Sequence, residues 1–170
     1  MATLEERVRR LEDRAELQDL VAAYFRAVDD DDYDAVGDSF TEDAEFVASG
    51  FEGDRTRDAV VAFLRAVRAG MGQTVHTPNY VQIEFLSDCE ATGLVGAHLE
   101  LGLGEQTYFG AVRYIDLYRR VEGRWRMARR EMKAIHMAPW SQVETSLTSA
   151  CNVRWPGAEP LPSDCPRKGK

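Results

Sequence analysis

The chain has 170 residues, of which 44% are hydrophobic and 29% charged, and these proportions exclude a disordered or collagen-like chain and indicate one folded domain. A formal net charge of −8 at pH 7 repels phosphate backbones, so nucleic acid is not expected as a partner. The chain begins with a charged segment and has no apolar run near the ~20 residues that a membrane span needs. We therefore expect a cytoplasmic protein without a membrane partner.

Three helices are expected in the first part of the chain. A Thr-x-x-Glu capping box opens the first helix, and apolar residues at helical spacing extend it from about 3 to 28. The acidic run 29–32 interrupts this pattern and can cap a second helix over 33–40. A short strand is expected at 45–48, and a third helix over 58–68.

Four longer strands follow, each rich in β-branched and aromatic residues and bounded by Gly, Asp or Ser: 75–86, 91–103, 106–119 and 124–134. Short turns between them indicate an antiparallel meander. The expected fold class is α+β, with a cone-shaped, strongly curved antiparallel sheet and three N-terminal helices that enclose a pocket. Residues 1–135 would form this domain, and 136–170 an irregular tail that covers the pocket or a subunit interface.

The spacing of the three histidines and three cysteines indicates neither a metal site nor a cofactor site. His98 alternates with apolar neighbours and is expected on the outer face of the sheet, and the position of His136 stays open. No compact ligand spacing or nucleotide-binding motif is present, so no metal or cofactor is expected. An odd cysteine count fits a reducing compartment, with Cys151 and Cys165 either reduced or paired with each other.

Asp29 ends the first expected helix, and His76 begins the first long expected strand. If the two side chains meet, the carboxylate accepts the Nδ1–H of the imidazole and leaves Nε2 as a general base. The alternative is a structural histidine whose hydrogen bonds are satisfied within the fold. The residues alone leave both interpretations open.

The later strands offer further polar side chains. If Met132 faces the pocket, the two-residue period places Arg130 there as well, where it needs a carboxylate partner or an anionic ligand. Tyr108, Tyr114 and Tyr118 share one face of their strand and are expected as core or pocket wall. A tyrosine that donates a proton is the second interpretation of this face.

Several segments together resemble the SnoaL-like branch of the nuclear-transport-factor-2-like superfamily. The segments are Arg14-Ala15-Glu16-Leu17-Gln18-Asp19-Leu20, Val28-Asp29, Phe40-Thr41-Glu42-Asp43-Ala44-Glu45-Phe46, Val75-His76 to Ile83-Glu84-Phe85, and Tyr118 to Trp125. The resemblance spans about residues 10 to 135. It is nearest to the branch that contains scytalone dehydratase and hexachlorocyclohexane dehydrochlorinase.

This resemblance implies a cofactor-independent lyase or cyclase that acts on a small apolar molecule of aromatic or polyketide-like character. Asp29 and His76 would form the acid–base dyad, and Arg130 would be the third catalytic residue. Tyr24 stands where the dehydrochlorinase carries a lysine. The implied substrate-binding residues are Tyr24, Phe46, Leu99, Tyr108, Tyr114 and Met132.

Three other functions stay open: a ketosteroid-type isomerase, a non-catalytic ligand-binding or oxygenase small-subunit module, and a metal enzyme. The expected partners are a small-molecule substrate and further copies of the chain, as a homodimer or homotrimer. The candidate residues for the contact between copies are Tyr118, Trp125, Trp140 and Trp155.

Overall fold

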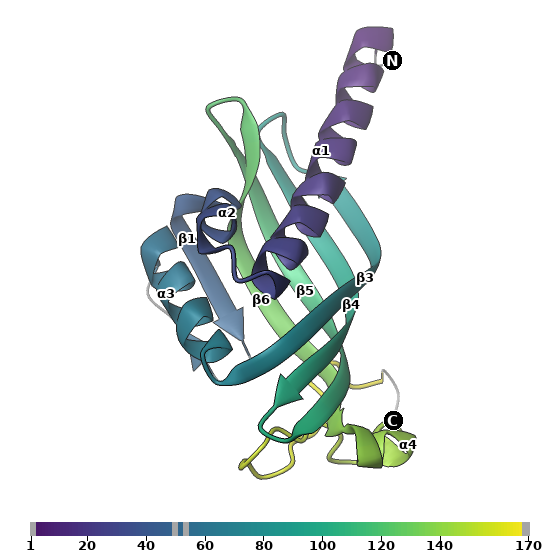
Figure 1. Ribbon diagram of the computed structural model, residues 1–170. Helices are drawn as coiled ribbons and strands as arrows, with labels where there is room; N and C mark the ends of the chain where they lie inside the picture. Colours follow the sequence, from purple (N-terminus) through teal and green to yellow (C-terminus); the bar gives the residue numbers. More distant parts are fainter. Residues whose placement is uncertain (1–2, 49–50, 53–54, 168–170) are drawn as a thin grey trace.

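The computed structural model describes residues 3–48, 51–52 and 55–167. In chain order the elements are α1 (Leu4–Asp29), α2 (Tyr33–Asp38), β1 (Phe40–Ala48), β2 (Phe51–Glu52), α3 (Arg57–Arg68), β3 (Met71–Phe85), β4 (Glu90–Leu103), β5 (Gln106–Val121), β6 (Arg124–Pro139), the 3-10 turn η1 (Trp140–Gln142) and α4 (Val143–Ser146). Helix α1 packs against β3, and α3 against β1, so the helices cover one side of a curved sheet (Figure 1).

The sheet has the strand order β2-β1-β6-β5-β4-β3. Strands β3 to β6 form the expected antiparallel meander, and the predicted α+β class with a curved sheet is confirmed. The expectation of a wholly antiparallel sheet is wrong at one pair, because β1 runs parallel to β6. These two strands are joined by α3 and the rest of the meander rather than by a hairpin, so no turn fixes their relative direction.

Helix α1 begins with the predicted capping box: the Thr3 hydroxyl accepts the backbone N–H of Glu6, and the Glu6 carboxylate accepts that of Thr3. Its buried apolar residues lie in the second half of the helix, at Leu17, Val21, Tyr24, Phe25 and Val28. The first half extends past the sheet (Figure 1), with Leu4 75% and Leu11 67% exposed. Within the described residues no helix, α1 included, is both long and apolar enough to span a membrane.

The strands are longer than the sequence pattern predicts. β1 begins at residue 40 rather than 45, and β3 begins at 71 rather than 75. β6 continues to residue 139, past its expected end at 134, because its pairing with β5 extends as far as Tyr108 and Pro139. Backbone hydrogen bonds maintain the strand at these ends, where the alternation of apolar side chains is weak.

Two of the residues expected at a contact between copies lie inside the protein. Tyr118 and Trp125 are buried in the core, so that expectation is wrong for both. Trp155 packs partly buried against the same core, whereas Trp140 is 63% exposed. The cysteines are free thiols, so Cys151 and Cys165 do not pair.

Two glycines in β4 allow aromatic rings to lie directly against the sheet, and their replacement should have different costs. A Cβ at Gly93 would lie 2.5 Å from the ring of the fully buried Tyr118, whereas one at Gly96 would lie 2.3 Å from the ring of Tyr80, which is 44% exposed and can move aside. Gly93→Ala should lower the free energy of unfolding by about 1–3 kcal/mol, and Gly96→Ala by less than about 1 kcal/mol. Urea unfolding of both variants tests this order, and equal losses would contradict it.

Candidate active site

Asp29 and His76 meet where α1 ends beside β3. Asp29 Oδ1 lies 2.6 Å from His76 Nδ1, and Asp29 Oδ2 accepts the backbone N–H of His76 at 2.8 Å. The hydroxyl of Thr74 donates to the same Oδ1 at 2.6 Å. Phe25 stacks on the imidazole, with ring centroids 5.3 Å and planes 12° apart. The structure thus brings together the two residues that the sequence proposes as a dyad and fixes the plane of the ring.

The partners of the imidazole determine which nitrogen is free. Asp29 Oδ1 accepts from Nδ1, so in the neutral ring Nδ1 carries the proton and Nε2 is the acceptor. Nε2 makes no hydrogen bond with the described residues, and His76 forms part of a cavity wall. This nitrogen is therefore available to accept a proton from a molecule in the cavity.

Asp29 needs its partners because of its position. It is the last residue of α1, where the negative end of the helix dipole disfavours an anion. Burial also raises the pKa of the Asp29 carboxyl, but the hydrogen bonds from His76 and Thr74 and the charge of the imidazolium outweigh it and hold the pKa below its ordinary value. The carboxylate stays ionised at neutral pH and can stabilise a protonated His76.

His76 and Thr74 line a cavity of about 330 Å³ between the helices and the sheet, and Asp29 binds both of them from outside the lining. Most of the lining is apolar, and the polar Thr74 and Arg68 bind each other next to the dyad. The lining residues come from α1, β1, α3, each strand from β3 to β6, and the C-terminal segment: Tyr24, Val28, Phe46, Ala48, Phe63, Leu64, Val67, Arg68, Met71, Thr74, His76, Leu99, Leu101, Tyr114, Met132 and Trp155. An apolar chamber with a few convergent polar groups is the usual form of a small-molecule site.

Most of the residues proposed for substrate binding lie in this lining, namely Tyr24, Phe46, Leu99, Tyr114 and Met132. Tyr108 does not. It is buried near the start of β5, opposite Pro139 at the end of β6, and lies outside the cavity wall. Its even spacing from Tyr114 gives it the same face of the strand, but the cavity does not extend along the whole strand.

Two tyrosines, Tyr24 and Tyr114, form part of the cavity wall. Burial raises the pKa of Tyr24 to about 12, partly offset by the charge of Arg130. Burial also raises the pKa of Tyr114 well above its ordinary value. Both phenols are therefore neutral at physiological pH and can donate a hydrogen bond or a proton to a group in the cavity.

Arg130 lies behind these tyrosines and not in the cavity wall. It is 0% exposed, and its guanidinium donates to both oxygens of Asp116 at 2.9 and 2.7 Å. The guanidinium carbon lies 4.4 Å from the ring centroid of Tyr24 and 4.6 Å from that of Tyr114. Tyr118 donates to the same carboxylate at 2.6 Å. Arg130 is buried as expected, with Asp116 as the carboxylate partner that such an arginine needs, but the expectation that it shares the pocket with Met132 is wrong, so it is not placed to contact a ligand there.

The other two histidines lie away from the dyad. His98 is exposed, as predicted for the outer face. His136 is buried, and its ring lies 3.0 Å from the hydroxyl of Ser146 in α4. That hydroxyl donates to the Val143 carbonyl, so His136 Nδ1–H is the donor to Ser146. In the part of the chain that the structure describes, no group of three or more His, Cys, Asp and Glu side chains is placed to hold a metal ion.

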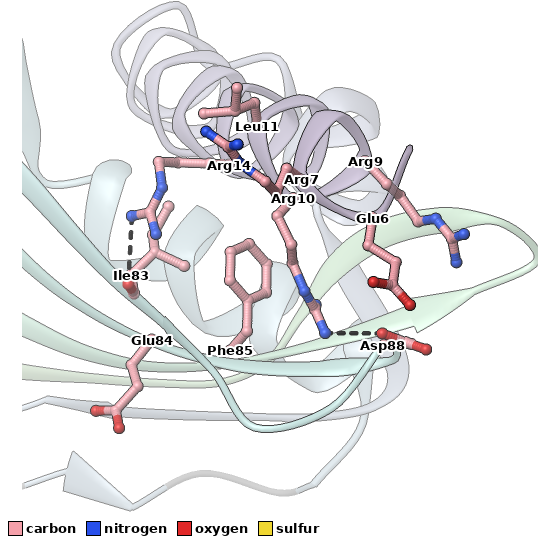
Figure 2. Close-up of a pocket in the computed structure, with 10 residues that line it drawn as sticks. All are labelled: Glu6, Arg7, Arg9, Arg10, Leu11, Arg14, Ile83, Glu84, Phe85 and Asp88. Carbon is pink, nitrogen blue, oxygen red and sulfur yellow. Dashed lines mark hydrogen bonds and ion pairs between the residues drawn. The ribbon is translucent and has the colours of Figure 1, made fainter. Parts of the chain in front are cut away.

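A larger, more open groove of about 790 Å³ lies between the projecting half of α1 and the end of β3 (Figure 2). Arg10 pairs with Asp88 at 2.7 Å, and Arg14 donates to the Ile83 carbonyl at 3.3 Å. Both guanidinium groups lie over the ring of Phe85. These contacts attach α1 to the β3–β4 hairpin, and the groove contains no pair comparable with the dyad. We therefore place the site in the smaller cavity.

Among the lining residues that the sequence did not assign to the site, three carry polar groups: Arg68, Thr74 and Trp155. Thr74 could have been found, because it lies two residues before His76 and shares its strand face. Arg68 has the appearance of an ordinary basic residue in the last turn of a helix. Trp155 follows the last strand in a segment without periodicity, and no sequence signal places this particular residue in the cavity wall.

The curved α+β sheet with this cavity is the fold of the SnoaL-like proteins. A model of the SnoaL-like domain matches residues 9–131, and the chain belongs to this family. No curated protein matches the chain.

Solved structures share the fold at low sequence identity. A candidate scytalone dehydratase from Novosphingobium aromaticivorans is 21% identical, with a TM-score of 0.71 over 78% of this chain and 90% of that one. The hexachlorocyclohexane dehydrochlorinase LinA-type3 from Novosphingobium barchaimii is also 21% identical, with a TM-score of 0.75 over 80% and 95%. A candidate aromatic ring hydroxylase from Novosphingobium aromaticivorans is 28% identical, with a TM-score of 0.70 over 76% and 94%.

The buried pair of Arg130 and Asp116 should be essential for stability. Arg130→Met leaves the carboxylate buried without its counter-charge and should lower the free energy of unfolding by about 3–5 kcal/mol. The neighbouring Arg129 is partly exposed, so Arg129→Met should cost about 1 kcal/mol or less. Urea unfolding measures both, and a loss below about 1 kcal/mol for Arg130→Met would contradict the assignment.

His136 should make stability depend on pH. Burial lowers the pKa of this ring in the folded protein below the value of about 6.5 in the unfolded chain, so the unfolded chain binds the proton more readily. The contribution of neutral His136 to the free energy of unfolding is complete above about pH 6.5. It is lost as the pH falls through the pKa that the ring has in the folded protein.

Urea unfolding at about pH 7.5 and about pH 5.5 measures this loss. The difference between the two pH values should shrink most in His136→Gln. In His98→Gln, which removes only the smaller Coulombic effect of His98 on the pKa of His136, most of the difference should persist. A full pH dependence in His136→Gln would show that another group is responsible.

Proposed function

We propose that the protein is a cofactor-independent lyase or cyclase that uses Asp29 and His76 for general acid–base catalysis. The observation that carries the proposal is the short contact between these two side chains at the wall of an apolar cavity. Family membership and the dehydratase and dehydrochlorinase among the similar structures support the same reaction class. Elimination, internal addition and double-bond isomerisation all need a base of this kind, and elimination is the reaction that these relatives favour.

In an elimination, His76 Nε2 takes a proton from a carbon of the substrate. The electron pair of the broken C–H bond becomes the new C=C bond, and a hydroxide or halide leaves the neighbouring carbon with its own electron pair. The phenol of Tyr24 or Tyr114 donates a hydrogen bond or proton to the leaving group. Asp29 holds the Nδ1–H tautomer and stabilises the imidazolium. Arg130 holds the two tyrosine rings from behind.

The cavity also defines a class of substrate. Its lining is mainly aliphatic and aromatic, and Arg68 is the one cation among the described lining residues. The Arg68 guanidinium is bound to Asp31, Gly72 and Thr74, so it offers little to an anionic group. We therefore propose an uncharged aromatic or polyketide-like molecule that fits about 330 Å³.

A probe of proton abstraction tests the dyad without knowledge of the natural substrate. In nitrobenzisoxazole a base removes the C–H proton, the electron pair forms the nitrile, and the N–O bond breaks to release a coloured phenolate. His76→Gln and Asp29→Asn should lower kcat/KM for this ring opening by about 100-fold or more. His98→Gln is the matched control and should leave the rate unchanged. Equal rates in the parent chain and His76→Gln would contradict the mechanism.

A second function, a non-catalytic subunit that binds a ligand or an oxygenase, has one observation in its favour. The 28% identical structure is named for an aromatic ring hydroxylase. Such a subunit should bind aromatic probes without accelerating the ring opening, and it should co-purify with a large iron-containing chain. If the parent chain accelerates the ring opening and His76→Gln does not, the lyase or cyclase is favoured.

A further inference from the structure

Arg68 connects three parts of the chain next to the dyad. It is the last residue of α3 and is buried. Its Nε and Nη2 donate to the two oxygens of Asp31 at 2.8 and 3.1 Å, just beyond the end of α1. Its Nη1 donates to the Gly72 carbonyl at 3.3 Å and to the Thr74 hydroxyl at 2.8 Å, both in β3. One guanidinium therefore joins α3, the turn after α1 and the strand that carries His76.

The Thr74 hydroxyl carries the effect of Arg68 to the dyad. A hydroxyl has one hydrogen, and Thr74 uses it to donate to Asp29 Oδ1 at 2.6 Å. Its oxygen then accepts from Arg68, which gives the donor order Arg68 to Thr74 to Asp29. Asp29 Oδ1 also accepts from His76 Nδ1 at 2.6 Å. The same carboxylate oxygen thus receives two short hydrogen bonds, one of them polarised by a cation.

We propose that Arg68 is a positioning residue for the dyad and acts on Asp29 through the hydroxyl of Thr74. It fixes the orientation of the carboxylate and draws negative charge away from the oxygen that faces the imidazole. Asp29 therefore interacts less strongly with a charged imidazole than an unassisted carboxylate would. The inference rests on the proposed function for its catalytic meaning, but the hydrogen bonds themselves do not depend on a substrate.

The other charged groups near the dyad are paired with one another. From α1 the ring contacts Asp29 and the uncharged Phe25. Arg130 of β6 lies behind the two cavity tyrosines and is balanced by Asp116. The carboxylate of Asp31, in the turn after α1, pairs with Arg68. Removal of Arg68 therefore removes a cation and also leaves Asp31 unbalanced, and both changes favour a protonated His76.

A structural role for Arg68 has to be separated from this effect. Asp31 has a positive φ of 55°, and Arg68 together with Tyr33 binds its carboxylate, so Arg68→Met also weakens the turn after α1. Thr74→Val keeps the shape of the side chain and the pair of Arg68 with Asp31, and it removes only the hydroxyl. Thr74→Ser restores the hydroxyl. The threonine variants therefore test the relay even if Arg68→Met does not fold.

The experiment follows the imidazole resonances of the folded protein by NMR as the pH changes, with no substrate present. The chain has only three histidines, and His76→Gln assigns the relevant signal. In Thr74→Val and in Arg68→Met the His76 signal should titrate about 0.5–1 pH unit higher than in the parent chain. In Thr74→Ser it should titrate as in the parent chain.

Because Arg68 acts through Thr74, Thr74→Val should shift the His76 signal in the same direction as Arg68→Met does. An unchanged titration in Thr74→Val overturns the relay, whether or not Arg68→Met shifts the signal. Failure of the proposed function is a separate result, since it would appear as absence of ring opening in the parent chain. If ring opening is present, the acid limb of its kcat/KM profile should move in the same direction as the NMR signal.

Discussion

A carboxylate at the carboxyl end of a helix faces partial negative charge from the peptide dipoles and is stable there only when donors surround it. Asp29 occupies this position and accepts from the His76 ring, the His76 backbone and the Thr74 hydroxyl. All three donors come from one end of β3, so the register between α1 and β3 determines whether the dyad exists. The fold on either side of this contact maintains that register: α1 through its buried apolar face, and β3 through its long ladder with β4.

The interior contains two polar centres with different surroundings. The pair of Asp29 and His76 lies at the cavity wall, where one ring nitrogen is accessible. The pair of Arg130 and Asp116 is completely enclosed, with Tyr24 and Tyr114 between it and the cavity. An ion pair behind neutral phenols supplies an oriented dipole without contact with the cavity. The arrangement separates the accessible ring nitrogen from a pair of charges that is fully buried.

Local sequence patterns predicted the three N-terminal helices and the four long strands, and they made a contact between Asp29 and His76 possible. Period-3.6 patterns located the helices, and alternation with turn residues located β3 to β6, because these local signals coincide with burial. The parallel contact between β1 and β6 and the last residues of β6 have no such signal, since distant backbone pairing determines them. For the site, Asp29 and His76 stood at the ends of predicted elements, where geometry could bring them together.

Other parts of the site depended on three-dimensional packing. Arg130 was expected inside, yet the sequence could not show that Asp116, on the neighbouring strand, would be its partner. Arg68 looked like an ordinary cation in the last turn of a helix. Its contact with Thr74 depends on the short turn between the end of α3 and the start of β3. Tyr108 satisfied the strand period but lies beyond the end of the cavity. Periodicity identifies a face of a strand, and only the packed structure identifies a place along it.

Trp155 gives the cavity a wall that the family model does not include. The match to the SnoaL-like domain ends at residue 131, whereas Met132 and Trp155 both line the cavity. The segment around Trp155 is attached to the strand edge through Val153, which pairs with Met137, and through Asp164, whose carboxylate accepts the backbone N–H of Ala134. Proteins that share the matched domain can therefore differ in the size of this cavity, because part of its wall comes from residues that lie outside the match.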